Sequence, residues 1–378
     1  MAATEVQRGL QDVVALQSRI CFIDGRLGRL IYRGYDIRDL AAHATFEEVA
    51  YLLWYGKLPT AAHLAELQHR LASLRTLPPE LVRELDALPL TSQPMDVLRT
   101  AVSSLALFEP GETAPGPSSI GGALRLTAAL PTILGSFQRR RAHLPLIEAR
   151  PKLSHAAYLA YAILNREPTE LEARALDVAL ILHADHELNA STFAARVTAS
   201  TLSDLYSAVT SAIGTLKGPL HGGANERVME MLDEIDSVDR VEEVIREKLA
   251  RHERIMGFGH RVYKVEDPRA TILREWLRKI SEAKENLRYY QLLQKVVEVV
   301  EVGHREKGLY PNLDLYSGSL YRLMGVPHDL FTPVFAASRV VGWTAHVLEE
   351  YDDLRLIRPS AAYVGPTDLT YVPAAKRS

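Results

Sequence analysis

The sequence has a single cysteine, Cys21, among its 378 residues. One cysteine cannot close an internal disulfide bond, and it excludes metal centres that need several thiolates. This usage fits a reducing compartment, so we expect a cytoplasmic location. The N-terminus lacks a basic segment followed by an apolar run, and no stretch approaches the ~20 apolar residues that span a bilayer. We therefore expect no membrane partner.

Neither sign of charge predominates, because the formal net charge is only −3. This balance gives no general attraction to a polyanion, and we expect no nucleic-acid partner. The sequence also lacks two nucleotide-binding signatures, GxGxxG after a strand and GxxxxGK[ST]. Hydride transfer from a dinucleotide and P-loop phosphoryl transfer therefore have no support.

Apolar residues recur at intervals of three and four along most of the chain, which is the spacing of amphipathic helices. Thr45 and Glu48 form a capping-box pattern before one such run, and Gly56 ends it. The sequence predicts helices over residues 46–55, 61–76, 79–88, 94–108, 120–141, 154–165, 170–188, 198–216, 225–235, 238–254, 268–281, 289–307 and 333–348. Residues 139–141, a run of three arginines, are expected to form a solvated helix end.

Strand signals are confined to residues 19–34, where two short β-type runs flank Asp24, Gly25 and Gly28. This pattern predicts a small N-terminal β-hairpin in a fold that is otherwise mainly α. Residues 110–119 are rich in Gly, Pro and Ser and are predicted to be a loop. Small side chains over 198–216 fit either a helix-to-helix subunit interface or tight packing within the chain.

Residues 255–269, IMGFGHRVYKVEDPR, form the clearest candidate for a binding loop. Gly257 and Gly259 carry no Cβ, so the backbone can turn tightly and approach a ligand. A titratable imidazole and several cations follow at once, namely His260, Arg261, Lys264 and Arg269. Such a loop can hold a polyanion and polarise a group beside it.

The helix predicted over 170–188 is apolar on almost all sides and runs into His183, Asp185, His186 and Glu187. In a continuing helix His183 and His186 would share a face, and Asn189 would extend the row. These residue types also suit a divalent cation, which leaves a metal-dependent hydrolase as one alternative.

Three further polar residues stand out by their neighbours. His221 precedes a predicted helix, where the helix dipole disfavours a charged imidazole. Asp314 lies between apolar residues, so it is either a desolvated base or part of a turn or helix cap. Arg339 has no acid within one helical turn in sequence, so a distant acid or a ligand must balance its charge.

Together these side chains suit a small dicarboxylate, with arginine forks for its carboxylates, neutral imidazoles for carbonyl oxygens and a carboxylate base. The set comprises His186, His221, His260, Asp314, Arg269, Arg339 and Arg358. Proton abstraction from carbon is the chemistry that this inventory favours.

Several long segments, in the same order, resemble the citrate synthase family: LILHADHELNASTFAARV, LKGPLHGGANE, ERIMGFGHRVYKVEDPRA, YPNLDLYSG, LFTPVFAASRVVGW and RLIRP. The resemblance implies a multi-helical fold of two domains, a large one from residues 1–216 and 325–378 and a small one from 217–324. It also implies a homodimer with its active sites between the domains. The implied enzyme is an acyltransferase of the tricarboxylic acid cycle, which converts the acyl group to an alkyl group on transfer.

The resemblance also assigns roles to residues of this chain. It implies that His221 binds the thioester oxygen, that His260 donates to the oxaloacetate carbonyl, and that Asp314 is the base. It places oxaloacetate against His186, Arg269, Arg339 and, across the dimer interface, Arg358. It places coenzyme A against Ile255, Met256, Gly257, Phe258, Gly259 and Lys264. The expected partners are oxaloacetate and the co-substrate acetyl-CoA, with no permanently bound cofactor and no metal.

Two alternatives remain besides the hydrolase. A 2-methylcitrate synthase would use the same residues on propionyl-CoA, and one methylene changes binding by only ~1 to 3 kcal/mol. A helical scaffold without catalytic activity is the other.

Overall fold

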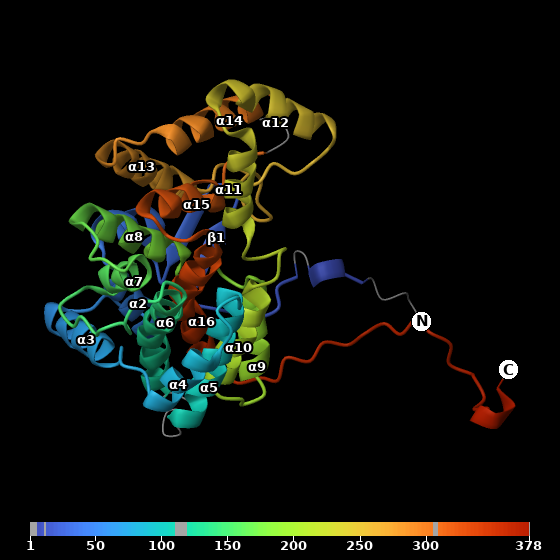
Figure 1. The fold of residues 1–378 in the computed structure, drawn as a ribbon. Coiled ribbons are helices and arrows are strands. Elements are labelled where there is room, and N and C mark those ends of the chain that lie inside the picture. Colours follow the sequence, from blue (N-terminus) through green and yellow to red (C-terminus); the bar gives the residue numbers. More distant parts are fainter. Residues whose placement is uncertain (1–5, 11–12, 110–118, 305–308, 378) are drawn as a thin grey trace.

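The computed structural model describes residues 6–10, 13–109, 119–304 and 309–377. Helices dominate these residues, as the sequence predicts (Figure 1). The α-helices are α1 Ile37–His43, α2 Phe46–Tyr55, α3 Ala61–Ser73, α4 Pro79–Ala87, α5 Pro94–Phe108, α6 Ile120–Arg141, α7 His155–Leu164, α8 Glu170–His183, α9 Ala190–Ala199, α10 Leu205–Leu216, α11 Ala224–Ile235, α12 Val241–Ala250, α13 Pro268–Ala283, α14 Arg288–His304, α15 Leu313–Met324 and α16 Phe331–Asp352. The strands are β1 Cys21–Asp24, β2 Arg29–Tyr32 and β3 Tyr35–Asp36.

Local signals set most helix ends. Thr45 and Glu48 form the expected capping box at the start of α2, and Gly56 ends that helix in the left-handed region with φ 74°. The predicted hairpin is present as β1 and β2, joined antiparallel with Cys21 opposite Tyr32. A third, short strand, β3, extends it to a small sheet because the chain turns again after Tyr32.

The predicted helix over 170–188 is too long. α8 ends at His183, and Glu187 has φ 53°, a left-handed conformation that no helix contains. The row of His183, His186 and Asn189 on one face is therefore wrong. Asn189 instead caps α9 by accepting a hydrogen bond from Thr192 N.

Other predicted elements are interrupted or shorter. The segment 198–216 is not one helix, because Asp204 caps a new helix, α10, by accepting from Ser207 N at 2.9 Å. The segment 238–254 contains a short 3-10 turn followed by α12, which ends at Ala250. The predicted loop over 110–119 lies outside the described residues except for Ser119, which precedes α6.

The three arginines at the end of α6 are not simply solvated, contrary to expectation. Arg140 donates to the carbonyls of Leu85 and Leu88, and Arg141 pairs with Asp329 at 2.7 Å. The last carbonyl groups of a helix have no partner within the helix, and an arginine side chain has enough N–H donors to bond to several of them at once. These residues therefore tie α6 to α4 and to the segment before α16.

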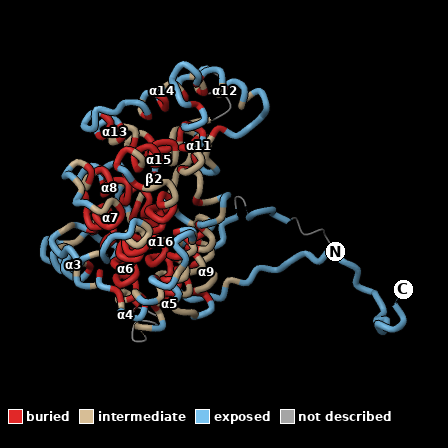
Figure 2. The backbone as a smooth tube through the Cα atoms, in the orientation of Figure 1, coloured by how far each residue is buried: buried red, intermediate tan, exposed pale blue. Residues whose placement is uncertain are grey.

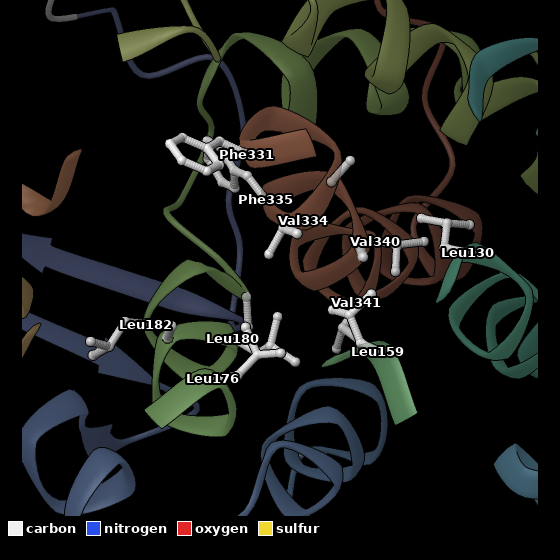
Figure 3. Close-up of a cluster of buried hydrophobic side chains, with 14 of the residues drawn as sticks. Leu130, Leu159, Leu176, Leu180, Leu182, Phe331, Val334, Phe335, Val340 and Val341 are labelled. Atoms are coloured by element: carbon white, nitrogen blue, oxygen red, sulfur yellow. The ribbon is translucent and has the colours of Figure 1, made fainter. Parts of the chain in front are cut away.

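The core is built around α16 and α6. In Figure 3 side chains of α16, including Val340 and Val341, face Leu130 of α6 and Leu180 of α8. Contrary to expectation, α6 is long and apolar enough to cross a membrane by length and composition, but 89% of that stretch is buried inside the protein. Its apolar surface is therefore satisfied by neighbouring helices.

Helices α11 to α15 lie together at one end of the molecule, and α2 to α10 and α16 form the larger body (Figure 1). Packing of α13 on α8 and of α11 on α16 joins the two groups. The chain beyond α16 runs away from this body and is exposed along almost its whole length (Figure 2).

Gly342 of α16 gives a prediction on stability. A Cβ at this position would lie 2.2 Å from Ala184 O and 2.5 Å from Asp185 Oδ1. We expect Gly342→Ala to lower the free energy of unfolding by about 1 to 3 kcal/mol, since this overpacking exceeds the ~1 kcal/mol gained from helix propensity. Denaturant titration measures the change.

Gly214 of α10 is the matched control. It also lies in a helix, but its Cβ would meet only Arg99 Cδ, at 3.8 Å. Gly214→Ala should therefore be neutral or raise the free energy of unfolding by up to ~1 kcal/mol. Equal behaviour of the two variants would contradict the packing argument.

Candidate active site

The glycine-containing loop over 255–259 is fastened to the residues that begin α15. Gly259 N donates to Tyr310 O, and Asn312 N donates to Gly257 O, both at 2.9 Å. Gly257 has φ 81°, and a Cβ there would lie 2.8 Å from Leu315 Cα. Glycine is thus required both for its conformation and for the close approach. The loop and α15 form one unit.

His260 follows this loop, and backbone amides fix its tautomer. Its Nδ1 accepts hydrogen bonds from Val262 N at 3.0 Å and from Tyr263 N at 3.2 Å. Burial, aided by the Arg269 charge, lowers the pKa of His260 to about 4. The ring is therefore neutral at physiological pH, with its proton on Nε2, free to act as a donor.

His186 lies in the turn after α8, beside His260. The two ring centroids are 5.2 Å apart, and Tyr263 Oη lies 3.4 Å from His186 Nε2. Burial, with the charge of Arg269 next in effect, holds the pKa of His186 well below its usual value. His186 is thus a second neutral imidazole at the same place.

His221 precedes α11 and contacts the start of α9. Ser191 N lies 3.3 Å from His221 Nε2 and can only donate, and Ser191 Oγ lies 2.8 Å from the same atom. The proton of the neutral ring therefore sits on Nδ1. Burial lowers the pKa of His221 to about 4, and the Arg339 charge acts in the same direction.

Asp314 occupies the first turn of α15. Asn312, not Asp314, caps this helix, since Asn312 Oδ1 accepts from Asp314 N at 3.0 Å. Within the described residues nothing hydrogen-bonds to the Asp314 carboxylate. Burial raises the pKa of Asp314 to about 6, although the charges of Arg269 and Arg339 oppose the rise. A carboxylate held in this way is a stronger base than an exposed one.

Two buried arginines flank these groups, and their partners differ. Arg269 is paired bidentately with Asp267, at 3.0 Å and 2.7 Å. Arg339 donates through Nε to His183 O at 2.6 Å, and no acid in the described part of the chain lies within ion-pairing distance. Its terminal nitrogens bond to no protein acceptor among those residues. Burial lowers the pKa of Arg339 to about 10, so it stays charged and can bind an anion.

A chain of buried, hydrogen-bonded polar side chains begins at Asp185, in the turn that carries His186. Asp185, fully buried, lies 3.2 Å from His346 Nε2, and Arg196 donates to His346 Nδ1 at 3.2 Å. Arg196 in turn pairs with Glu350 at 2.7 Å. Burial alone would raise the pKa of Asp185, but His346 and Arg339 hold it below its usual value. Asp185 thus supplies the nearest compensation for the Arg339 charge.

This arrangement does not favour the hydrolase alternative. Asp185 is engaged with His346, and His183 Nδ1 lies 2.7 Å from Ala179 O. Among the residues that the structure describes, no three His, Cys, Asp or Glu side chains are grouped as a metal site.

Most of the predicted site residues lie close enough to influence one another's pKa. The charges of Arg269 and Arg339 lower the pKa of His186, and the same two charges oppose the rise in the pKa of Asp314. Lys264 is exposed near this group, with its ammonium 3.4 Å from Arg261 O. Arg358 is different, because it lies on the exposed C-terminal segment and contacts none of the other site residues.

The sequence reasoning missed Ser191, Tyr263 and Asp267. Asp267 could have been found, because an aspartate directly before Pro268 is a recognisable helix cap. Ser191 and Tyr263 carry no such local signal, since their contacts are with residues 30 and 77 positions away.

Chemically, the cluster offers two neutral imidazole N–H donors, on His221 and His260. It also offers an arginine with unbonded nitrogens, Arg339, and a carboxylate of raised pKa, Asp314. Donors of this kind stabilise oxygen atoms that gain negative charge, and the carboxylate can accept a proton. The cluster therefore suits enolisation beside a carbonyl, with a dicarboxylate held by the arginines.

Comparisons with known proteins agree with this chemistry. The family described as "Citrate synthase, C-terminal domain" matches residues 9–360. Citrate synthase of Haloferax volcanii is 47% identical, with 99% of each chain covered. A 2-methylcitrate synthase of Shewanella oneidensis is 44% identical over 92% of each chain. A structure of Thermoplasma acidophilum citrate synthase, in ternary complex with carboxymethyl coenzyme A and oxaloacetate, is 36% identical to this chain, with a TM-score of 0.92. It covers 99% of this chain and 100% of its own.

Proposed function

The chain belongs to the citrate synthase family, and on this premise we propose how its residues carry out the reaction. Citrate synthase condenses acetyl-CoA with oxaloacetate and hydrolyses the product to citrate and coenzyme A, so the enzyme is an acyltransferase that turns the acyl group into an alkyl group. It needs no permanently bound cofactor, and acetyl-CoA is a co-substrate. The observation that carries the assignment of roles is the unbonded Asp314 carboxylate, with its raised pKa, beside two buried arginines.

Oxaloacetate binds first to the arginines in this proposal. Arg339 offers its unbonded terminal nitrogens to one carboxylate, and Arg269, held by Asp267, contributes to the other. His186 and His260 surround the ketone, and His260 Nε2–H points a donor at its oxygen. The ketone carbon becomes electrophilic without a charged imidazole.

Asp314 then removes a proton from the methyl group of acetyl-CoA. A carboxylate is a weak base for a carbon acid, so the enol must be stabilised while it forms. His221 does this through Nδ1–H, because its Nε2 is occupied by Ser191. A neutral donor matches the weakly basic enol oxygen better than an imidazolium would.

Condensation and hydrolysis complete the reaction. The enol carbon attacks the ketone carbon, the new alkoxide takes the proton of His260 Nε2–H, the proton removed by Asp314 restores that ring, and citryl-CoA is formed. Water then cleaves the thioester and releases coenzyme A. Closure of residues 217–324 over the rest of the chain, the two proposed domains, would exclude water until the carbon–carbon bond exists.

In this proposal coenzyme A binds against the loop from Ile255 to Gly259, which includes Met256, Gly257 and Phe258. Lys264 lies near its phosphates. Three features support this position. The backbone turns tightly at two glycines with positive φ, the loop is hydrogen-bonded to the start of α15, and an exposed ammonium follows it.

A thiol-release assay tests the function. With oxaloacetate and acetyl-CoA, the protein should release coenzyme A and form citrate, and omission of oxaloacetate should abolish release. Absence of turnover by folded protein would refute the proposal.

A 2-methylcitrate synthase is the second candidate, favoured by the 44% identity to the Shewanella enzyme. The same assay with propionyl-CoA decides between them. We expect a higher kcat/KM with acetyl-CoA, and a clear preference for propionyl-CoA would reverse the choice.

The pH dependence follows from Asp314. Its pKa of about 6 means that the basic, ionised form is complete above that pH and is lost below it. We expect kcat/KM for acetyl-CoA to fall about tenfold per pH unit below pH ~6, because each unit removes nine-tenths of the base. His221 and His260 stay neutral there, with pKa values of about 4. A flat profile down to pH 5 would contradict the assignment.

A homodimer is a further part of the proposal, with Arg358 reaching the active site of the partner chain. The exposed C-terminal segment supports it, since Tyr363, Val364, Leu369 and Tyr371 on this segment are 71% to 96% exposed. Apolar surface of this kind usually meets a partner. A cytoplasmic location fits the single, buried Cys21.

Mixing two inactive variants tests the role of Arg358. Arg358→Ala and Asp314→Asn protomers, denatured and refolded together, would form mixed dimers in which one site keeps both native residues. About a quarter of the wild-type activity should return for random pairing. No recovery, with mixed dimers present, would place Arg358 outside the partner's site.

A further inference from the structure

The turn of the N-terminal hairpin contacts the loop that carries His260, although the mechanism above gives the hairpin no part. We call residues 24–28 the hairpin turn and residues 260–264 the histidine loop. Lys264 N donates to Gly25 O at 2.8 Å, so the two backbones are hydrogen-bonded. They also touch, because a Cβ at Gly25 would lie 2.2 Å from Val262 O.

Three consecutive residues of the histidine loop, Val262, Tyr263 and Lys264, connect this contact to the active site. The backbone amides of Val262 and Tyr263 hold His260 Nδ1, and the Tyr263 hydroxyl lies 3.4 Å from His186 Nε2. The Tyr263 ring also packs against the His260 ring, with centroids 4.8 Å apart. A shift of this backbone would therefore move the donors that fix His260.

Gly25 is required here for close approach. Its φ does not lie in the left-handed region, so an alanine would suffer no backbone strain. The obstacle is the carbonyl of Val262, which a methyl group at position 25 would displace. By contrast, the side chain of Leu27 in the same turn is 67% exposed.

Asp24 sets the conformation of the turn. Its Oδ1 accepts hydrogen bonds from Arg26 N at 3.0 Å and from Leu27 N at 2.9 Å. This is the local bonding by which an aspartate stabilises a tight turn. Asparagine keeps the acceptor oxygen, and alanine removes it.

We propose that Gly25 is a positioning residue for His260: the hairpin turn fixes the backbone of the histidine loop, and this backbone fixes the tautomer and direction of the imidazole. The inference deepens the proposed function and rests on it, because it assumes that His260 polarises the oxaloacetate ketone. Neither Gly25 nor Asp24 touches substrate in this view.

The test compares Gly25→Ala with the unaltered protein and with Leu27→Ala as the matched control. Two quantities are measured: kcat and KM for oxaloacetate, and the ¹³C chemical shift of oxaloacetate labelled at its ketone and bound to the protein without acyl-CoA. A displacement of about 1 Å can cost ~100-fold in rate, so we expect kcat/KM to fall about 10- to 100-fold. The bound ketone signal should move towards that of free oxaloacetate. Leu27→Ala should match the unaltered protein within about twofold.

Two variants of Asp24, Asp24→Ala and Asp24→Asn, provide a test that adds no bulk, in case Gly25→Ala does not fold. Asp24→Ala should change kcat/KM and the ketone signal in the same direction, and Asp24→Asn should restore both. A native ketone signal in Gly25→Ala, or in folded Asp24→Ala, would overturn the proposal. If the unaltered protein forms no citrate, the proposed function fails instead, so the two failures are distinguishable.

Discussion

Replacement of Asp314 by asparagine is expected to lower kcat by about 10³-fold while the affinity for oxaloacetate changes little. A positioned base contributes ~10² to 10⁴ to the rate, and the amide cannot accept the methyl proton of acetyl-CoA. The substitution is nearly isosteric and breaks no hydrogen bond, since nothing in the described residues bonds to the Asp314 carboxylate. Steady-state kinetics and calorimetric titration with oxaloacetate measure the two effects.

Asp177 provides the matched control for this experiment. It is a buried aspartate, whose pKa burial raises to about 7, but it bonds to Phe46 N and Arg174 in the larger body of the protein. Asp177→Asn should leave kcat within about threefold and act on stability instead. Substantial turnover by Asp314→Asn would remove Asp314 from the role of base.

Replacement of Arg339 by alanine is expected to raise KM for oxaloacetate by about 10² to 10³. Its Nε bonds to His183 O, but the terminal nitrogens have no acceptor among the described residues, and the nearest compensating acid, Asp185, forms no ion pair with Arg339. Removal of one partner from a buried charged pair costs ~2 to 5 kcal/mol, which sets the expected range. Arg339→Lys keeps the positive charge but loses the planar pair of guanidinium donors. Its KM for oxaloacetate should lie between those of the unaltered protein and Arg339→Ala.

Arg75 is the control for a buried arginine outside the site. It is also nearly fully buried, but it donates to the carbonyls of Arg150 and Leu153. Arg75→Ala should lower stability and leave KM for oxaloacetate unchanged. If Arg339→Ala behaves in the same way, Arg339 is a structural residue that serves the end of α8.

Much of the fold was predictable because its signals are local. Capping residues and terminal glycines mark helix ends within a few positions, as Thr45 and Gly56 do for α2. The end of α8 was not, because the residues after His183 have helix-like composition. What stops the helix there is tertiary: Asp185 is held by Tyr32, whose hydroxyl donates to Asp185 O at 2.7 Å, and by His346. Neither partner is near in sequence.

The candidate site divides in the same way. The residue types of the dicarboxylate site could be chosen from the sequence, since a histidine or arginine among apolar residues is conspicuous. Their protonation states could not. The tautomer of His221 depends on Ser191, and Arg339 is unpaired because no acid in the described part of the chain lies within ion-pairing distance of it in three dimensions. Arg358 stays a prediction, because its proposed contact lies in a second chain.

The buried chain from Asp185 through His346 to Arg196 and Glu350 has a consequence for how this protein can vary. Loss of one member leaves a neighbouring charge or polar atom without its partner inside the protein, which costs more than loss of the pair. Random mutagenesis should therefore report activity defects at His346 and Arg196, which touch no substrate in the proposed mechanism. Among diverging relatives, substitutions at these positions should appear together rather than one at a time.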